Sequence, residues 1–361
     1  MKTFPLLLAL LWIPFSVMAQ DYLVRFKKNG KYGYKNEKDQ IIIPAKYDFS
    51  SDFYGKLTPV KLNHTWGFIN KKGVLVTPLK YDSADDYFPS TDRAWVLYKG
   101  KAGMIDGTGK EVIPTKYDAL GHAFGYGVDY IRNNKKYGLI SKDGVELASP
   151  QYDSMTVDYA WRENRIGVRL NGKWGFIDLE GNLKVPCRYD AVEEFQEGHA
   201  LVTLNTKKGF VNREGVEIIP PVYDEATTFY RYAAAVKRDG KWGFVNEKGE
   251  VLGKIEYQSV GEFRFDKFAA VELDGHWGMV DTEGNVVVPL RFSSVKIVFT
   301  DDQKNVFVAT RLGGRWGVVD TKGNTIAQQK YDEIYLDYDK IAFKLDGKQG
   351  YIDKDGKEVW R

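Results

Sequence analysis

A glycine that usually follows an aromatic residue recurs ten times along the chain, and this repeat limits the available folds more than any other feature. The intervals between these glycines run from 33 to 39 residues. Such periods are typical of arrays in which each repeat is one small unit that buries its apolar face against its neighbours. The ten motif glycines are Gly33, Gly67, Gly103, Gly138, Gly175, Gly209, Gly243, Gly278, Gly317 and Gly350.

Three further residues keep a fixed distance from the motif glycine. An Asp or Asn follows three residues later in nine copies, and a Gly follows six residues later in nine. An aromatic residue follows fourteen residues later in all nine copies that extend that far, and in seven of them it begins a Tyr-Asp pair. The distance from this aromatic to the next motif glycine varies from 19 to 25 residues. The first part of the repeat is therefore a fixed unit, and the second contains the loop that accepts insertions.

Each copy has the sequence of short strands joined by tight turns. In one copy, residues 233–237 alternate as in a strand, and Asp239-Gly240 is a hairpin turn. Residues 242–245 predict the next strand. Residues 246–249 predict a turn in which the Asn side chain accepts backbone N–H groups and the glycine takes the left-handed conformation. A third strand follows, and in six copies it ends in a proline, which marks an edge because proline has no N–H to donate.

Several positions are expected to pack the units against one another. We predict that the Tyr of each Tyr-Asp pair is buried and that its Asp accepts backbone N–H groups. Glycine weakens a strand unless another group approaches closely, so we expect a neighbouring unit's aromatic ring to lie over the motif glycine. Aromatics six or seven residues after the Tyr, such as Phe53 and Phe229, are predicted core residues. Small residues suit close approach on an inner strand, and they recur at Ala94, Ala200, Ala234 and Ala269.

The combined motif resembles the WG (or KWG) repeats of bacterial exported proteins. Residues 173–178 and 241–249 show it most fully, and the resemblance covers essentially the whole chain after residue 19. It implies a β-rich repeat scaffold and no catalytic residues. The Trp-Gly pairs that carry it are Trp66-Gly67, Trp174-Gly175, Trp242-Gly243, Trp277-Gly278 and Trp316-Gly317.

These marks predict an all-β fold for residues 20–361. It is a tandem array of ten repeats, each with three to four short antiparallel strands, arranged as one or more propeller-like rings. An open β-superhelix or solenoid is the alternative arrangement.

The first 19 residues are predicted to be a secretory signal peptide. Lys2 supplies a positive charge, and residues 4–15 are apolar but too few to span a bilayer. Val17 and Ala19 are small residues at the positions that a signal peptidase reads. We therefore expect cleavage after Ala19 and export to the periplasm, the outer surface or the medium. No later apolar run approaches membrane length, so we expect no membrane insertion.

Composition and motifs argue against several classes of function. Apart from Lys2, the chain has 51 basic and 49 acidic residues, and this balance does not suggest a nucleic-acid partner. Cys187 is the only cysteine, and the spacing of Cys and His residues is not typical of a zinc site. The sequence has neither a nucleophile elbow nor a phosphate-binding loop. We predict a non-catalytic protein without cofactor or metal, and a glycosidase with two carboxylates is the least favoured alternative.

Candidate binding residues lie outside the repeat pattern. Loops on a rigid scaffold often carry function, and exposed aromatics and Arg often anchor interfaces. We predict a protein partner in the envelope or outside the cell, and the alternative is a glycan stacked on exposed rings. The candidates are three strand residues expected to face away from the core, Trp95, Tyr98 and Tyr130, and four linker residues, Trp161, Arg162, Asp301 and Asp302.

Overall fold

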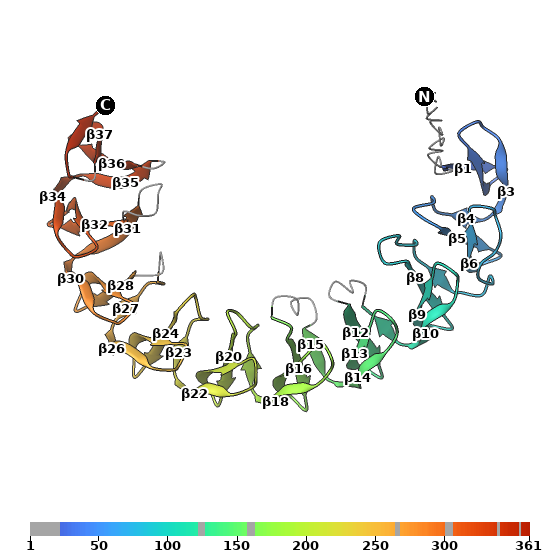
Figure 1. Cartoon of the computed structure of the whole chain (residues 1–361), viewed down its shortest axis with the longest axis horizontal. Helices are drawn as coiled ribbons and strands as arrows, with labels where there is room; N and C mark the ends of the chain where they lie inside the picture. The colour runs from blue at the N-terminus through green and yellow to red at the C-terminus, as the bar shows by residue number, and fades with distance from the viewer. Residues whose placement is uncertain are drawn as a thin grey trace, which may run out of the picture. The chain divides into compact units, whose positions relative to one another are not determined.

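The computed structural model contains ten small antiparallel sheets in tandem (Figure 1). It describes residues 22–121, 127–156, 163–263, 268–299, 306–337, 340–353 and 355–361. The predicted all-β repeat array is therefore confirmed. These ranges hold no helix long and apolar enough to cross a membrane. The predicted signal peptide and the four linker candidates Trp161, Arg162, Asp301 and Asp302 lie outside the described residues.

The chain forms two compact units, which meet in the sequence at Leu120 and Gly121, and both are built from the same repeat. In a complete sheet we name the strands A, B, C and D in chain order, which is also the order in which they hydrogen-bond. Unit 1 contains β1 (Leu23–Lys28), β2 (Lys31–Asn36) and β3 (Ile41–Tyr47) in sheet 1; β4 (Phe49–Ser50), β5 (Leu57–Leu62) and β6 (Thr65–Asn70) in sheet 2; β7 (Ser83–Ala84), β8 (Arg93–Tyr98), β9 (Lys101–Asp106) and β10 (Glu111–Tyr117) in sheet 3; and β11 (Ala119–Leu120).

Unit 2 holds the remaining strands. Sheet 4 contains β12 (Val128–Asn133), β13 (Lys136–Ser141) and β14 (Glu146–Tyr152). The next three sheets are β15 (Ser154–Thr156), β16 (Ile166–Leu170), β17 (Lys173–Ile177) and β18 (Leu183–Tyr189); β19 (Ala191–Val192), β20 (His199–Leu204), β21 (Lys207–Asn212) and β22 (Glu217–Tyr223); and β23 (Glu225–Ala226), β24 (Ala233–Arg238), β25 (Lys241–Asn246) and β26 (Val251–Tyr257). Sheets 8 to 10 are β27 (Ser259–Val260), β28 (Phe268–Leu273), β29 (His276–Asp281) and β30 (Val286–Phe292); β31 (Ser294–Phe299), β32 (Val306–Leu312), β33 (Arg315–Asp320) and β34 (Thr325–Tyr331); and β35 (Glu333–Asp337), β36 (Lys340–Leu345), β37 (Lys348–Ile352) and β38 (Glu358–Trp360).

The motif glycine lies on strand C and lies against the backbone of strand D in its own sheet. A Cβ added to Gly175 would be 2.3 Å from the carbonyl oxygen of Val185 and 2.8 Å from the amide nitrogen of Cys187. Strand D bulges here, because Trp174 pairs with Tyr189 while Phe176 pairs with Val185. The expectation that a neighbouring unit's aromatic ring covers this glycine is therefore wrong. The space is needed for the bulged backbone of strand D. The recurrent proline lies on this edge strand as predicted, but the strand does not end there, because β18 continues past Pro186 to Tyr189.

Rings from consecutive sheets pack on the residue that follows the motif glycine. The ring centroids of Phe210 and Phe229 are 4.8 Å apart in an edge-to-face contact. Phe229 belongs to the loop between strands A and B of sheet 7, and it is 1% exposed. The predicted core role of these loop aromatics is thus confirmed, and edge-to-face pairs add to the stability that burial gives. Equivalent pairs are Tyr34–Phe53, Phe176–Phe195 and Phe244–Phe263.

A separate apolar core lies between each of several pairs of consecutive sheets, so strand B is covered on both faces. On β24, Ala234 and Val236 pack with residues of sheet 6, while Ala233 and Ala235 pack with residues of sheet 8. Alternation along this strand therefore does not separate buried from exposed positions. Trp95, on β8, is 7% exposed. The expectation that it faces away from the core is wrong.

The turn between strands C and D forms as predicted. The Oδ1 atom of Asn246 accepts the backbone N–H groups of Lys248 and Glu250 at 3.0 and 2.9 Å. Gly249 has a φ of 80°, which a glycine adopts without steric cost. A Cβ there would also be 2.8 Å from the carbonyl oxygen of Ile218 in the preceding sheet. Glycine is therefore required both by the turn and by the packing of the neighbouring sheet.

The Tyr-Asp pair connects one sheet to the next. Tyr189 ends strand D of sheet 5 and is fully buried, and the chain then enters strand A of sheet 6. The Asp190 carboxylate pairs with Lys173 of sheet 5 and accepts the backbone N–H of Asn205, in the B–C turn of sheet 6, at 2.7 Å. The predicted buried ring and backbone-accepting carboxylate are confirmed. The corresponding ion pairs are Lys31–Asp48, Lys101–Asp118, Lys136–Asp153, Lys207–Asp224 and Arg315–Asp332.

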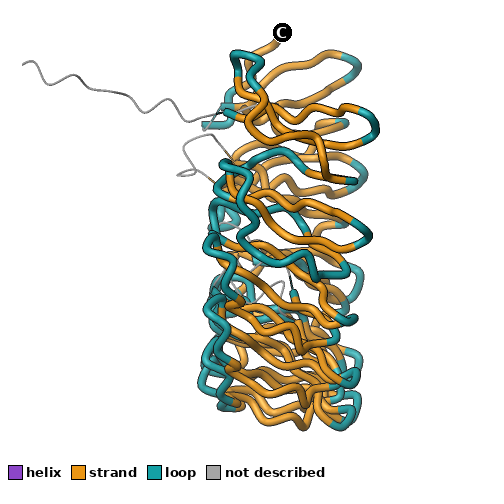
Figure 2. The backbone as a smooth tube through the Cα atoms, turned by 90° about the vertical axis from the view of Figure 1, so that its right-hand side faces the viewer, coloured by secondary structure: helices purple, strands orange, loops and turns teal. Residues whose placement is uncertain are grey.

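Loops gather at the two ends of the strands (Figure 2). We call the end with the B–C turns and the Tyr-Asp connections the pair rim. We call the end with the A–B loops and the C–D turns the loop rim. The two rims differ because the polar side chains of the pair rim are used to join consecutive sheets.

Replacing Gly175 with alanine is expected to destabilise the protein by about 1–3 kcal/mol, because the added methyl group meets backbone atoms that cannot move aside. The matched control is Gly261→Ala. There the nearest atom to an added Cβ is the Cβ of Ala270 at 3.7 Å, and φ is not positive. This control should be neutral or stabilise by up to about 1 kcal/mol. Urea unfolding followed by tryptophan fluorescence measures both variants, and equal losses would contradict the proposed role of the motif glycine.

Asp190→Asn should lower the urea midpoint at pH 7, and this deficit should shrink as the pH falls below the ordinary Asp pKa of 3.8. Hydrogen bonding to Lys173 and then to the Asn205 N–H lowers the pKa of the Asp190 carboxyl below its ordinary value of 3.8. A lowered pKa in the folded state contributes stability above the unfolded-state pKa, and that stability is lost as the pH falls through the folded-state pKa. The exposed Asp355→Asn is the control. A deficit that persists undiminished at pH 3 would show that the ion pair is not its cause.

Candidate functional site

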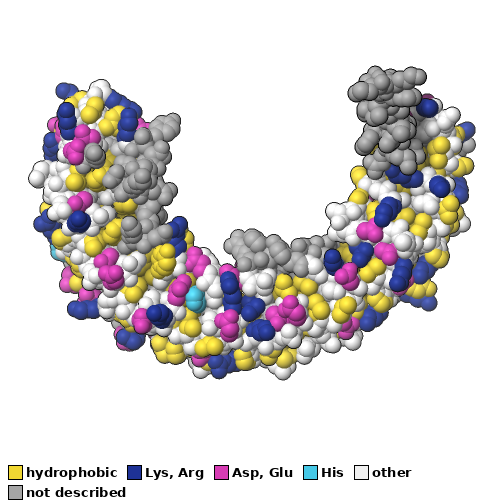
Figure 3. Space-filling view, in the orientation of Figure 1, with side chains coloured by type: hydrophobic (Ala, Val, Ile, Leu, Met, Phe, Trp, Pro, Cys, Tyr) yellow, Lys and Arg dark blue, Asp and Glu magenta, His cyan; other side chains and the backbone are white. Residues whose placement is uncertain are grey.

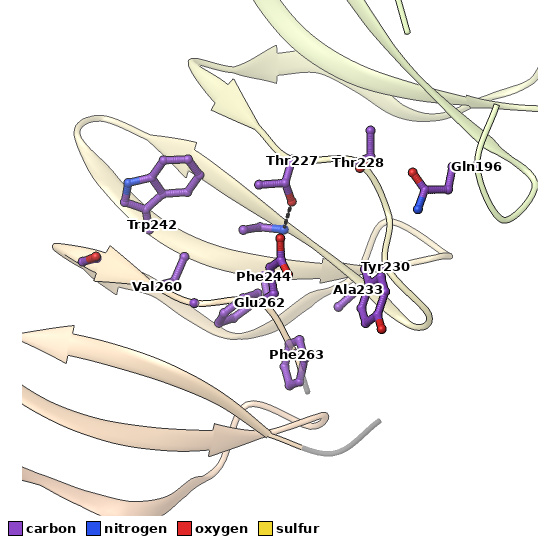
Figure 4. Close-up of a pocket in the computed structure, with 13 residues that line it drawn as sticks. Gln196, Thr227, Thr228, Tyr230, Ala233, Trp242, Phe244, Val260, Glu262 and Phe263 are labelled. Carbon is purple, nitrogen blue, oxygen red and sulfur yellow. Dashed lines mark hydrogen bonds between the residues drawn. The ribbon is translucent and has the colours of Figure 1, made fainter. Parts of the chain in front are cut away.

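Two adjoining clefts open along the loop rim of unit 2, between the A–B loops of consecutive sheets. The Ala235 cleft, of about 310 Å³, lies between sheets 7 and 8 (Figure 4). The Glu193 cleft, of about 400 Å³, extends over the A strands and loops of sheets 5 to 7. They share Gln196 and Thr228, so together they involve sheets 5 to 8. The Glu193 cleft is lined by Thr156, Val192, Glu193, Glu194, Phe195, Gln196 and Thr228.

Small side chains leave the space for the Ala235 cleft. Ala235 is the eighth residue before its motif glycine, and it faces sheet 8 across the core that contains Phe263. The same position in sheet 6 is Leu201, which is 3% exposed and fills the core against sheet 7. Gly261, on the opposite wall, adds no side chain. The space beside Ala235 thus depends on small residues from both facing sheets.

The interior of the Ala235 cleft is apolar and its mouth is polar. Ala233, Phe244 and Phe263 form the inner walls, and Trp242 lies at the end of the cleft far from the loops (Figure 4). Tyr230, which is 42% exposed, lies at the mouth. An apolar interior with a few polar groups at its mouth is the usual composition of a ligand site.

Hydrogen bonds hold the rim of this cleft in place. The hydroxyl of Thr227 accepts the N–H of Ala235 at 3.0 Å, and the N–H of Thr227 donates to the carbonyl oxygen of Ala235 at 2.9 Å. On the facing sheet, the N–H of Gly261 donates to the carbonyl oxygen of Ala270 at 2.8 Å. Both walls are therefore extensions of the sheets, and the cleft is formed before any ligand arrives.

Among the residues that the structure describes, the charged ones that line the two clefts are all acidic. They are Glu262 at the Ala235 cleft, and Glu193 and Glu194 at the other. Each of these three side chains is exposed. Elsewhere, basic and acidic side chains are interspersed on the visible face (Figure 3), and the whole chain has a net charge of +3. The clefts are thus locally acidic on a protein that is slightly basic.

The three described residues predicted to bind a partner do not line these clefts. Trp95 is buried, as shown above. Tyr98 is half-buried, and its ring lies 6.4 Å from that of Tyr81. Tyr130 is half-buried, and its ring lies 5.7 Å from that of Tyr137.

Sequence reasoning missed the residues that make the cleft, although the repeat contained the signal. Trp95 and Tyr130 occupy the same repeat position as Ala235, the eighth before the motif glycine. A small residue at this position is therefore one signal of a cleft. It does not single out Ala235, because the equivalent residues Ala270, Ala309 and Ala342 are equally small.

The carboxylates of the pair rim serve the packing of the sheets. Asp190 and its equivalents contact a Lys or Arg and a backbone N–H, and the Lys keeps the pKa of the carboxyl low. Among the described residues, no group of three or more His, Cys, Asp or Glu is arranged to hold a metal ion.

Comparison with solved structures gives low similarity. A crystal structure of a eukaryotic initiation factor matches with a TM-score of 0.33 and 10% identity, over 88% of this chain and 98% of that one. Hsv2p of Kluyveromyces lactis matches with a TM-score of 0.29 and 13% identity, over 65% of this chain and 92% of that one. AztD of Citrobacter koseri matches with a TM-score of 0.31 and 12% identity, over 82% and 91%. No curated protein sequence matches the chain.

Comparison with family models gives a definite result. The model described as the WG containing repeat matches nine stretches. Each begins at a motif glycine or at the residue before it. The matched residues are 32–64, 66–101, 103–137, 137–174, 174–207, 209–242, 242–276, 277–301 and 316–348. These stretches cover most of the chain, and the chain therefore belongs to the WG repeat family.

Proposed function

We propose that this protein is an exported, non-catalytic scaffold that binds a protein partner through the loop rim of unit 2. The observation that carries the proposal is the pair of adjoining clefts on that rim. In protein interfaces, binding energy concentrates at preformed clefts that take up an apolar side chain and exclude water from it. The loop rim is also where insertions change the length of the repeat, so it can vary without disturbing the sheets.

The contrast between the two rims supports this placement. On the pair rim, side chains such as Lys173 and Asp190 are engaged with one another and with backbone N–H groups. A partner would have to compete with these contacts. On the loop rim, Tyr230 and Tyr232 are 42% and 57% exposed, and Glu262 is exposed at the mouth of a cleft.

The Asp of the Tyr-Asp pair recurs in the same role from sheet to sheet, and this recurrence supports a non-catalytic scaffold. Six equivalent Asp residues pair with a Lys or Arg, which favours a structural role for all of them over one reaction centre. A general acid needs a raised pKa, whereas pairing with Lys173 lowers the pKa of Asp190. Export rests on the N-terminal sequence, whose short apolar run and small residues before Gln20 have the pattern of a signal peptide.

Glycan binding is the second proposal. The exposed rings of Tyr230 and Tyr232 support it, because sugar faces stack on exposed aromatic rings and hydrogen-bond to polar side chains such as Gln196 nearby. The burial of Trp95 removes one of the rings on which this alternative was first based.

Affinity capture from the cell envelope tests the leading proposal. We expect the tagged chain, residues 20–361, to enrich a specific protein and Ala235→Leu to lose it, because leucine fills the cleft as Leu201 does one sheet earlier. The control is Lys241→Gln on the pair rim, which should retain the partner. The melting temperature of Ala235→Leu should equal or exceed that of the parent, since the leucine enters existing space. Capture of no protein by the parent chain would reject the proposal, and binding to oligosaccharide arrays would then test the glycan proposal.

A further inference from the structure

We propose that the two clefts together bind an extended, basic peptide segment, with one apolar side chain in the Ala235 cleft and a Lys or Arg about three residues away at the Glu193 cleft. This inference rests on the proposed function, and it names the chemistry of the partner segment.

The apolar anchor follows from the interior of the Ala235 cleft. Its walls are Ala233, Ala235, Phe244 and Phe263, all at most 7% exposed and none able to pair with a charged group. The N–H of Thr227 donates to the carbonyl oxygen of Ala235, so neither of these two backbone groups is available to a polar group that enters beside them. A polar side chain inserted here would lose its hydrogen bonds to water, whereas an aliphatic or aromatic one would lose nothing. The volume of about 310 Å³ suits a large apolar side chain such as leucine or phenylalanine.

The basic residue follows from the charge of the lining. Among the described residues, Glu262 lines the Ala235 cleft and Glu193 lines the other, and both side chains are exposed. A segment with positive charge is thus attracted to this rim and an acidic one is repelled.

The spacing follows from the geometry of stacked sheets. The Ala235 cleft lies in the gap between sheets 7 and 8, and the Glu193 cleft reaches the gap between sheets 6 and 7, where Gln196 and Thr228 line it, so these two gaps are offset by one sheet. Packed sheets lie about 10 Å apart, and an extended chain advances about 3.3 Å per residue. One step between clefts therefore corresponds to about three residues of the bound segment.

A panel of fluorescein-labelled peptides tests the inference directly. Each peptide has one Leu and one Lys separated by zero to five Gly or Ser residues, in both orders, and fluorescence anisotropy measures its binding to residues 20–361. We expect the tightest binding with two or three intervening residues. Replacing the Leu with Ser, or the Lys with Glu, should weaken it at least tenfold. Affinity that does not depend on spacing would overturn the inference.

Protein variants locate the bound peptide. Ala235→Leu should weaken the best peptide at least tenfold, and Glu193→Gln should remove the advantage of the spaced Lys. Glu193→Lys should restore binding to the peptide with Glu in place of Lys. The matched control is Glu247→Gln, which removes one exposed charge from the C–D turn of sheet 7 outside both clefts, and should change affinity less than twofold. Unchanged binding by Ala235→Leu would overturn the inference.

The peptide and capture experiments fail in distinguishable ways. If a partner is captured and lost in Ala235→Leu but no peptide binds, the scaffold proposal stands and the basic, apolar segment is rejected. If the peptides bind as expected but no envelope protein is captured, the chemistry of the clefts is supported and the envelope partner is rejected.

Discussion

The contact between the motif glycine and the bulged strand D is the constraint on which the rest of the structure depends. Because Gly175 has no side chain, the backbone from Val185 to Cys187 lies directly on strand C. The bulge then places Tyr189 opposite Trp174, at the end of the sheet, with its ring buried between sheets 5 and 6. The next residue, Asp190, begins the following sheet and fixes its B–C turn. One missing side chain thus sets both the shape of a sheet and its connection to the next.

The same arrangement places different constraints on the two rims. The Tyr-Asp connection requires its Lys and its backbone N–H, so the pair rim is similar from sheet to sheet. The A–B loops each bury a ring, such as Phe229, and some also pair with the next sheet, as Glu163 does with Arg213. Variation in length collects in these loops. Beside the loop of sheet 7, the small residues Ala235 and Gly261 leave a gap between facing sheets.

Much of the fold was accessible from the sequence because its causes are local. A hairpin at Asp239-Gly240 and an Asn246 turn that ends at Gly249 depend on residues a few positions apart, and the repeat displays them many times over. The role of the Tyr-Asp pair was also predictable, since a recurrent carboxylate next to a recurrent ring is more readily structural than catalytic. What failed were predictions about which face a residue occupies. Trp95 alternates along a strand as a surface residue would, but it is buried. On the equivalent strand β24, sheets 6 and 8 cover both faces, so alternation does not mark the exposed positions.

The sequence by itself determined the number of repeats, the all-β class, the turns and the residues that join one sheet to the next, because each is encoded by residues close in the chain. Only the tertiary structure decided what lies against the motif glycine and where a cleft opens. Ala235 is an ordinary small residue in the sequence, and its consequence depends on Gly261 and Phe263, which belong to the neighbouring sheet and meet it only after both have folded. A cleft is a relation between two surfaces, and periodicity along one strand does not describe the surface that packs against it.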